Sequence, residues 1–427
     1  MKNSENKTSS GLINKSASEI IRLVDGTLMK QDIIDVLSRE YKKTSRQKIE
    51  ENFENLIYTL STKYNICIKT SDKPLSRKVE YISNNIIPGA ASLEITDKCN
   101  LRCRHCYGNF GPDKKNCSMD LENIKKILFD LFESGVKLLE LTGGDISTHP
   151  HLKDILVYAL SLNFVNISLL TNGILLNEDT LDIIIKHKNR FIVQIDVHSF
   201  NDDYLKWFTG KSGYLDKIKN TVCKLAKNGV IVRVAMIVTP KNLDEIIPIA
   251  EWAHSNQVRL FGASPVINLG RACINNDLLL SDDKEMPRYI EIMENLKKCY
   301  GDNFIFESPD NVRVNNNNCG CVTSHIVINS KGTIKLCTMD DISYCNTNFG
   351  NLLKKDLKKL YQENCEFMNK FSNWKSPRHN SDECKNCEFK FFCDSCILRG
   401  LTKASILKNK CKWYNNIDAT IKNQLGI

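Results

Sequence analysis

Cysteine is the residue type whose number and spacing could support chemistry in this chain. The sequence has 427 residues and 18 cysteines, and most of these cysteines fall into three groups. The groups are Cys99, Cys103 and Cys106, then Cys319, Cys321 and Cys337, then Cys384, Cys387, Cys393, Cys396 and Cys411. Thiolates gathered in this way are the usual protein ligands of zinc and of iron–sulfur clusters.

The cellular compartment decides whether these thiols are expected to form disulfides or to bind metal. Residues 1–6 are polar rather than an apolar signal peptide, and no run reaches the roughly 18 apolar residues of a membrane span. We therefore expect a cytoplasmic protein without a membrane span. Disulfides are rare in the reducing cytoplasm, so the clustered cysteines are expected to be metal or cluster ligands.

The first cysteine group has an incomplete set of ligands. Its three thiolates are one fewer than the four that a structural zinc site or a fully protein-ligated cluster needs. A [4Fe–4S] cluster held by Cys99, Cys103 and Cys106 would keep one iron open. The alternative is a zinc site completed by His105, but a ligand wedged between two of the cysteines has poor geometry.

Strand and helix patterns alternate between the first and second cysteine groups. Strand-like apolar runs lie around Leu93 and Ile95 and at residues 138–141, 165–170, 191–195, 230–238 and 260–262. Helical spacing of apolar residues separates the runs, for example from Leu121 to Leu131 before a stop at Gly135. Six strands alternating with helices predict an α/β fold with a parallel sheet, as a full or partial barrel over residues 86–305. Catalytic groups gather at the C-terminal ends of the strands in such barrels.

The first cysteine group resembles the signature of the radical S-adenosylmethionine (SAM) superfamily, which is Cys-x3-Cys-x-Φ-Cys with Φ usually aromatic. The resemblance implies a partial (β/α)6 barrel in which SAM chelates the open iron through its amino and carboxylate groups. Reductive cleavage of SAM then gives methionine and a 5′-deoxyadenosyl radical. His105 holds the Φ position, where the family's residue packs on the adenine.

Further SAM contacts follow from the same resemblance. Gly143, Gly144 and Asp145 stand where the family has Gly-Gly-Glu, which holds the SAM amino group; the acid here is one methylene shorter. The other positions that the resemblance implies are Asn172, Asp196 at the ribose, and Arg233 at the SAM carboxylate. Arg233 needs a partner if it faces inward, because burying an unpaired charge is costly, and a structural ion pair is favoured over the SAM-carboxylate contact as its role.

The later cysteines resemble the SPASM extension of radical SAM enzymes, which we place at residues 306–427. The resemblance implies two auxiliary [4Fe–4S] clusters and therefore three clusters in all. The outer set would be Cys384, Cys387, Cys393 and Cys411, and the inner set Cys319 or Cys321 with Cys337 and Cys396. One departure is the spacing of two residues rather than three before Cys396. A zinc ribbon is the alternative, but its cysteine pairs usually lie farther apart.

Residues 1–85 have the pattern of a winged helix. Ser16 and Glu19 form a capping-box pattern at the first of three predicted helices, and a strand is predicted at residues 64–68. Lys42, Lys43 and nearby basic residues could contact DNA phosphates. Around residues 14–26, however, the unit resembles the recognition element of enzymes that modify ribosomally made peptides. That element binds the precursor's leader as an added strand.

The three parts together resemble peptide-maturing radical SAM enzymes, most closely the sactisynthases, which join a Cys sulfur to the α-carbon of another residue. The resemblance implies a precursor peptide and an electron donor such as flavodoxin or ferredoxin as partners, and no nucleic acid. Carbon–carbon or side-chain thioether crosslinking and epimerisation are alternatives on the same scaffold. A cluster-containing DNA-binding redox regulator is an alternative of a different class. The net charge of +9 favours an acidic partner without requiring nucleic acid.

Overall fold

The computed structural model describes residues 15–24, 26–42, 44–62, 73, 87–113, 118–281, 283–305, 317–340 and 349–427. The chain divides into two compact units, Met1–Ser83 and Asn84–Ile427. Each unit has a hydrophobic core of its own, and the two cores share no residue.

The N-terminal unit contains the three helices that the sequence predicts. They are α1 (Lys15–Leu23), α2 (Lys30–Glu40) and α3 (Arg46–Thr62). Ile20, Ile34 and Phe53 bring one apolar face of each helix into a small core. The predicted cap is wrong in detail, because Ser16 lies inside α1 rather than before it, and Glu19 accepts a hydrogen bond from the Tyr41 hydroxyl. The strand predicted at residues 64–68 lies outside the described residues.

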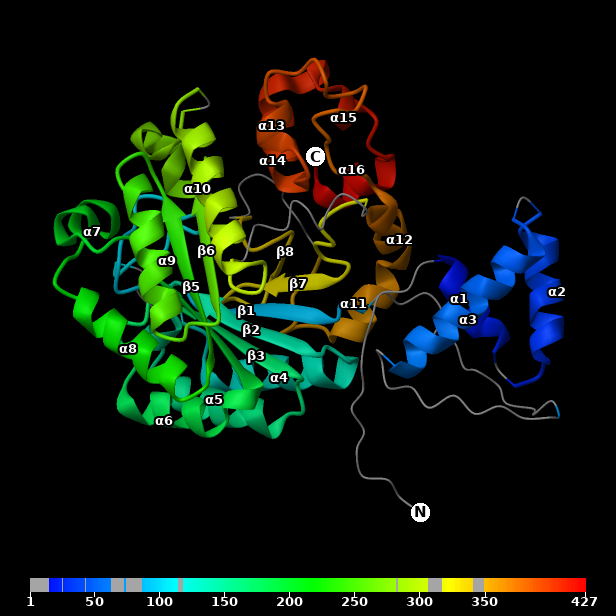
Figure 1. Ribbon diagram of the computed structural model, residues 1–427, viewed down its shortest axis with the longest axis horizontal. Coiled ribbons are helices and arrows are strands. Elements are labelled where there is room, and N and C mark those ends of the chain that lie inside the picture. Colours follow the sequence, from blue (N-terminus) through cyan, green and yellow to red (C-terminus); the bar gives the residue numbers. More distant parts are fainter. Residues whose placement is uncertain are drawn as a thin grey trace. The chain divides into compact units, whose positions relative to one another are not determined.

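A parallel sheet is the centre of the second unit (Figure 1). Its six predicted strands are confirmed as β1 (Ala90–Thr96), β2 (Leu138–Gly143), β3 (Asn166–Thr171), β4 (Phe191–Asp196), β5 (Ile231–Val238) and β6 (Leu260–Pro265). They lie in sequence order with parallel neighbours throughout. This arrangement is the predicted partial (β/α)6 barrel, and it brings all six C-terminal strand ends to one face.

Helices connect the strands and cover the outside of the sheet (Figure 1). They are α4 (Leu121–Ser134), α5 (Leu152–Ser161), α6 (Glu178–Lys186), α7 (Asp202–Thr209), α8 (Leu215–Lys227), α9 (Ile246–Ser255) and α10 (Glu285–Tyr300). Helix α4 shows how the sequence sets the boundaries. At the start of α4, the Asp120 side chain accepts a hydrogen bond from the Asn123 backbone amide. At its end, Gly135 takes the left-handed conformation with φ 100° and stops the helix.

The sheet continues into the C-terminal part of the chain, which the sequence did not predict. Strand β7 (His325–Ile328) pairs in parallel with β1, and β8 (Ile334–Lys335) pairs antiparallel with β7. Helices then complete the unit: α11 (Leu357–Glu363), α12 (Cys365–Asn373), α13 (Lys390–Cys393), α14 (Ile397–Leu407), α15 (Lys412–Asn415) and α16 (Ala419–Leu425). Across the described part of the chain, no helix combines the length and the apolar character that crossing a membrane requires.

A buried ion pair joins the C-terminal segment to the barrel. The Lys335 ammonium on β8 lies 2.7 Å from the Glu94 carboxylate on β1, and their side chains are only 4% and 2% exposed. Burial raises the pKa of Glu94, and the neighbouring Lys335 opposes that shift. Removing one partner of such a pair leaves an uncompensated buried charge, which is more costly than replacing both partners.

We expect Lys335→Met to lower the free energy of unfolding by about 3–5 kcal/mol, because Glu94 then loses its counter-ion. The raised pKa of Glu94 means that the folded state holds the proton better than the unfolded state does. The loss should therefore be largest at alkaline pH and shrink as the pH falls and Glu94 becomes protonated. Thermal unfolding of the cluster-free protein between pH 5 and pH 8 measures both effects.

Two controls accompany this substitution. Glu94→Gln combined with Lys335→Met removes both charges and should recover much of the stability. Lys153→Met breaks an exposed pair with Asp179, whose side chains are 58% and 67% exposed, and should cost less than about 1 kcal/mol. Equal losses from Lys335→Met and Lys153→Met would contradict the importance of the buried pair.

Candidate active site

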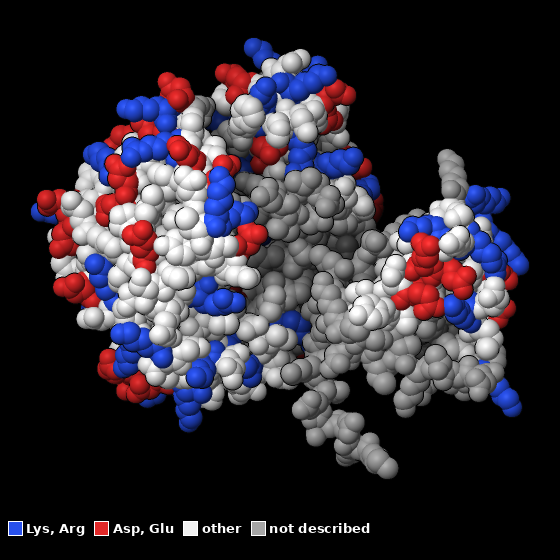
Figure 2. Space-filling model, viewed as in Figure 1, with Lys and Arg blue, Asp and Glu red and all other residues white. Residues whose placement is uncertain are grey.

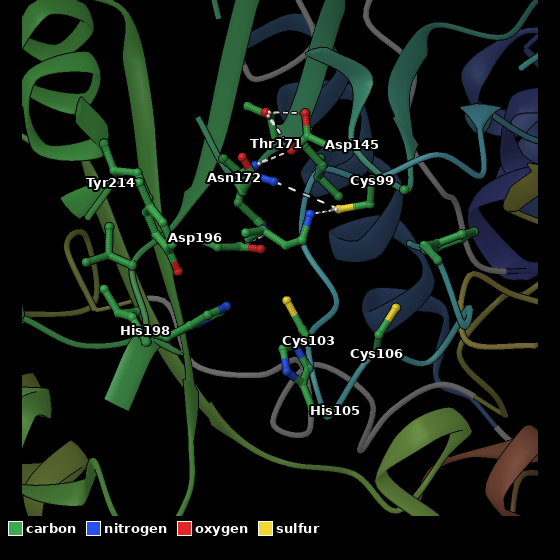
Figure 3. A pocket seen from close by; sticks show the side chains of 18 of the residues that line it. Cys99, Cys103, His105, Cys106, Asp145, Thr171, Asn172, Asp196, His198 and Tyr214 are labelled. Atoms are coloured by element: carbon green, nitrogen blue, oxygen red, sulfur yellow. Dashed lines mark hydrogen bonds between the residues drawn. The ribbon is translucent and has the colours of Figure 1, made fainter. Parts of the chain in front are cut away.

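A cavity at the C-terminal ends of the strands contains the first cysteine group. Cys99, Cys103 and Cys106 follow β1 and line this cavity together with residues that end β2, β3 and β4. In Figure 3 the three cysteines surround one open space, with Asp145, Thr171 and Asn172 on one side of it and Asp196 and His198 on another. The fold therefore assembles motifs that lie about a hundred residues apart in the sequence.

The cysteine loop is held in place by the segment after β6. The Arg271 guanidinium donates to the Cys103 carbonyl through Nε at 2.8 Å and to the Phe110 carbonyl through Nη1 at 2.8 Å. The Arg271 amide donates to the Cys106 carbonyl at 3.0 Å. Gly270 has φ +57°, and a Cβ there would collide with the Cys106 and Tyr107 carbonyl oxygens. Arg271 also lines the cavity, so it positions the cysteines, a role that the sequence analysis missed.

The two glycines after β2 allow the backbone to approach the end of β1 closely. Gly143 has φ +135°, and a Cβ on either Gly143 or Gly144 would overlap the carbonyl oxygen of Thr96 or Lys98. The Gly144 amide donates to the Thr96 carbonyl at 2.7 Å. Side chains at these two positions would therefore push the turn away from β1 and reshape the wall of the cavity.

Asp145 is buried, and its carboxylate is bonded to protein groups. It accepts hydrogen bonds from the Ser147 amide at 2.9 Å, the Thr171 hydroxyl at 3.0 Å and the Asn172 amide at 2.7 Å. Burial raises its pKa, and these donors oppose the shift. The shorter acid therefore ties the end of β2 to the end of β3, while it also lines the cavity.

Asn172 and Asp196 both reach the cavity, as the sequence predicts for SAM contacts. The Asn172 side-chain amide donates to the Asn100 side chain at 2.7 Å, beside Cys99. Burial raises the pKa of Asp196 to about 7, with nearby Asp145 adding to the shift and Gln194 and Arg233 opposing it. A cationic ligand in this cavity would favour the ionised form of Asp196.

His105 lies half-buried in the cavity wall. It stacks on Phe208 with ring centroids 4.6 Å apart and packs edge-on against His198 at 5.4 Å. Burial lowers the pKa of His105 well below its usual value and that of His198 to about 4. His105 Nδ1 is buried with no hydrogen-bond partner among the described residues. His198 is a second lining residue that the sequence analysis did not select, although it follows Asp196 by two positions.

Arg233 is the one predicted SAM contact that does not line this cavity. It lies on β5 opposite Gln194 of β4, within electrostatic reach of Asp196 and Glu140. Both roles considered for Arg233, a contact with the SAM carboxylate and a structural ion pair, stay predictions.

In the folded chain, the cysteines of the second and third groups form two sets that differ from their grouping in the sequence. Cys319, Cys321, Cys337 and Cys396 line one cavity and affect one another's ionisation. Cys384, Cys387, Cys393 and Cys411 line another and do the same. Cys396 belongs to the third group in the sequence, but in the structure it lies with the inner set. This is the division that the resemblance implies.

The donor sets suit iron–sulfur clusters. Burial raises the pKa of Cys99 to about 12, with Asp145 and Cys106 adding to the shift, and binding of a positive metal centre would favour the thiolate and release its proton. No three Cys, His, Asp or Glu side chains among the described residues converge on a single metal ion. His105, whose Nδ1 is unpaired among the described residues, and the Gly143–Gly144 turn line the same cavity as the three cysteines.

Comparison with known families and relatives identifies the domains. The radical SAM superfamily matches residues 93–253, and SPASM, an iron–sulfur cluster-binding domain, matches residues 319–388; together they cover more than half of the chain. The antilisterial bacteriocin subtilosin biosynthesis protein AlbA of Bacillus subtilis is 27% identical over 95% of this chain and 88% of the relative. The sporulation killing factor maturation protein SkfB of the same organism is 24% identical over 70% of this chain and 72% of the relative.

Solved structures show the same fold at low identity. Streptococcus suis SuiB bound to the precursor peptide SuiA has a TM-score of 0.60 and 14% identity, over 96% of this chain and 93% of that chain. The structure of anSMEcpe with bound AdoMet has a TM-score of 0.56 and 15% identity, over 79% of this chain and 96% of that chain. The two family matches, at residues 93–253 and 319–388, show that the chain carries a radical SAM domain followed by a SPASM iron–sulfur domain.

Proposed function

We propose that this enzyme matures a ribosomally synthesised peptide in the cytoplasm by joining a Cys sulfur to the α-carbon of an acceptor residue. The observation that carries the proposal is the cavity in which Cys99, Cys103 and Cys106 meet the Gly143–Gly144 turn, Asn172 and Asp196. Similarity to AlbA over 95% of the chain, through the N-terminal unit as well as the barrel, supports a peptide substrate.

Three [4Fe–4S] clusters have ligand sets in this chain. Cys99, Cys103 and Cys106 would hold the SAM-binding cluster, with His105, the glycine turn, Asn172 and Asp196 around SAM. Cys384, Cys387, Cys393 and Cys411 would hold the outer auxiliary cluster. Cys319 or Cys321, Cys337 and Cys396 would hold the inner one. The mutual electrostatic effects within each set support this division.

With a cluster held by Cys99, Cys103 and Cys106 and SAM bound beside it, the site would supply a 5′-deoxyadenosyl radical able to remove one hydrogen atom from the acceptor α-carbon. Thioether formation also releases the thiol proton and one electron, so the peptide becomes two hydrogens lighter for each bond formed. The electron that cleaves SAM is balanced by the electron that leaves the product, which makes SAM the net oxidant. The protein's part is to keep the cavity closed to water and to fix the α-carbon near SAM.

The partners follow from the same proposal. The N-terminal unit would bind the leader of the precursor, in line with the solved structure of SuiB bound to its precursor peptide. A flavodoxin or ferredoxin would supply the first electron. In Figure 2 positive and negative side chains are interspersed over the visible surface of the second unit, rather than forming one basic face of the kind that binds nucleic acid.

A deuterium label at the acceptor α-carbon tests the bond that forms. The substrate is a Cys-containing precursor peptide, sought among the short reading frames that adjoin that of this chain and made with α-deuterated residues. We expect deuterium in 5′-deoxyadenosine and a product two hydrogens lighter per link, because the α-hydrogen is the atom abstracted. Mass spectrometry of the peptide and of the nucleoside measures both, and a precursor with its Cys residues replaced by Ser serves as the control.

The other chemistries of this scaffold give different results in that experiment. Epimerisation would leave the peptide mass unchanged in ordinary water, because a hydrogen returns to the α-carbon. Label arriving only from a β- or γ-carbon would identify side-chain thioether or carbon–carbon crosslinking and would overturn the α-thioether proposal. Absence of any SAM-dependent change in the peptide would count against a peptide maturase.

A further inference from the structure

His198 lies in the wall of the cavity that contains the first cysteine group, on the same side as Asp196 (Figure 3). It follows the end of β4 by two residues, and only 6% of its surface is exposed. In Figure 3 its ring points from the end of β4 into the open space before Cys103. The hydrogen-bonding state of its two ring nitrogens therefore decides what this side chain can do in the cavity.

A backbone hydrogen bond fixes which ring nitrogen of His198 carries the hydrogen. The Ile237 amide on β5 donates to His198 Nδ1 at 3.2 Å. Because Nδ1 accepts, the neutral ring carries its hydrogen on Nε2. Burial lowers the pKa of His198 to about 4, so the ring is neutral near pH 7. His198 therefore presents an uncharged N–H donor at Nε2.

This Nε2 donor is open to the cavity. Within the described residues, the hydrogen bond from Ile237 to Nδ1 is the only one that the His198 ring makes. Unlike His105 Nδ1, which is buried, His198 Nε2 keeps accessible surface in the cavity wall. A donor held in a mostly buried wall without an acceptor favours a ligand that supplies one.

Hydrogen bonds behind the ring hold the backbone of His198 in place. The Asn242 side-chain amide is fully buried and donates to the His198 carbonyl at 2.7 Å and to the Ile237 carbonyl at 2.9 Å. Glu245 accepts a hydrogen bond from the hydroxyl of the next residue, Ser199. Both anchors come from the segment after β5, so the barrel itself positions the ring. A donor held in this way loses little conformational entropy when it binds a ligand.

The rings around His198 indicate which part of SAM it faces. His105 and Phe208 form a parallel stack with ring centroids 4.6 Å apart, and His198 packs at right angles to both, at 5.4 Å and 5.2 Å. His105 is the residue proposed to pack on the adenine. Asp145, next to the glycine turn proposed for the SAM amino group, lies on another side of the cavity (Figure 3). His198 therefore stands at the nucleoside end of the site rather than at the methionine end.

Resting on the SAM-binding part of the proposed function, we propose that His198 binds SAM directly by donating its Nε2–H to an acceptor atom of the adenosyl group. The adenine ring nitrogens and the ribose oxygens are the acceptors of that group, and both take a hydrogen bond from a neutral donor. The contact fixes the adenosyl group beside His105 and thereby positions its 5′-carbon relative to the acceptor peptide.

The affinity for SAM tests this contact without requiring catalysis. Equilibrium dialysis with the reconstituted full-length protein measures the Kd. His198→Phe keeps a ring but has no donor, and we expect it to weaken SAM binding about tenfold at an iron content equal to that of the wild type. His198→Gln should keep most of the affinity, because its side-chain amide also offers a donor. Equal weakening by both variants, or an unchanged Kd in His198→Phe, would overturn the inference.

His149→Phe is the matched control. His149 is also buried, at 4% exposed, and its Nδ1 also accepts a hydrogen bond from a backbone amide, that of His151, at 3.2 Å. Its Nε2, however, is bonded to the Met119 carbonyl at 2.8 Å, and it is not among the described residues that line the cavity. The control should therefore bind SAM as the wild type does. A loss equal to that of His198→Phe would attribute the effect to the missing buried imidazole and refute the direct contact.

Analogues of SAM identify the acceptor atom. In each analogue, one adenine ring nitrogen is replaced by C–H, or one ribose oxygen by CH₂ or hydrogen. One analogue should bind the wild type about tenfold more weakly than SAM, yet bind His198→Phe as well as SAM does, because it lacks the partner of His198. A nitrogen analogue with this behaviour places the acceptor on adenine, and an oxygen analogue places it on the ribose. Equal losses in the wild type and His198→Phe for every analogue would overturn the inference. Failure of the wild type to bind SAM would refute the proposed function instead.

Discussion

Replacing Cys99, Cys103 and Cys106 together by Ala is expected to abolish reductive SAM cleavage. The three thiols share one cavity at the strand ends, and the hard chemistry of such an enzyme belongs to the cluster rather than to the side chains. Formation of 5′-deoxyadenosine should fall at least about 10³-fold, to the level of a reaction without enzyme. Chromatography of the nucleoside after anaerobic incubation with dithionite measures the loss.

The triple variant also separates the cluster sites from one another. The inner and outer cysteine sets lie in cavities of their own, so the variant should retain about two thirds of the wild-type iron. The matched control replaces Cys223, Cys299 and Cys365, which belong to none of the three groups, by Ala and should leave SAM cleavage within twofold of the wild type. Persistent SAM cleavage in the Cys99, Cys103 and Cys106 variant, or iron near four per chain with stoichiometric zinc in the wild type, would contradict the cluster assignment.

The barrel could be predicted because its strands are encoded locally. The apolar runs from Leu93 to Gly262 alternate with helical spacing, and all six became parallel neighbours in sequence order. The pairing of β7 with β1 could not be predicted in the same way. Strand β7 has four residues and lies more than 200 residues after β1, so tertiary packing rather than local pattern places it on the sheet.

The site was predictable where a motif fixes residue type and spacing together. His105, the Gly143–Gly144 turn, Asn172 and Asp196 all reach the predicted cavity. Arg271 and His198 were missed because their roles depend on contacts that only the fold creates. The Gly270–Arg271 pair directly after the last strand was the available signal, since a glycine at a strand end often marks a close backbone approach. The roles of the predicted SAM contacts and cluster ligands remain predictions.

Removal of residues 1–83 is expected to weaken precursor processing by about 10²–10⁴-fold at low micromolar substrate while sparing SAM cleavage. The second unit keeps its entire core in the shortened chain, because the two cores share no residue. A leader held by the N-terminal unit would raise the effective concentration of the core peptide to the millimolar range, and this advantage disappears with the unit. Initial rates of crosslinking against precursor concentration, with 5′-deoxyadenosine measured in parallel, give the result.

The physical cause of that loss can be tested by concentration alone. If the unit acts as a tether, the shortened enzyme should regain most of its crosslinking rate when the precursor is raised to millimolar levels, because kcat depends on the barrel. A precursor without its leader should be processed equally by the full and shortened enzymes. Full activity of the shortened enzyme at low micromolar precursor would contradict leader binding. Tight, sequence-selective binding of duplex DNA by the full chain would instead favour a regulator, since a winged helix most often serves that purpose.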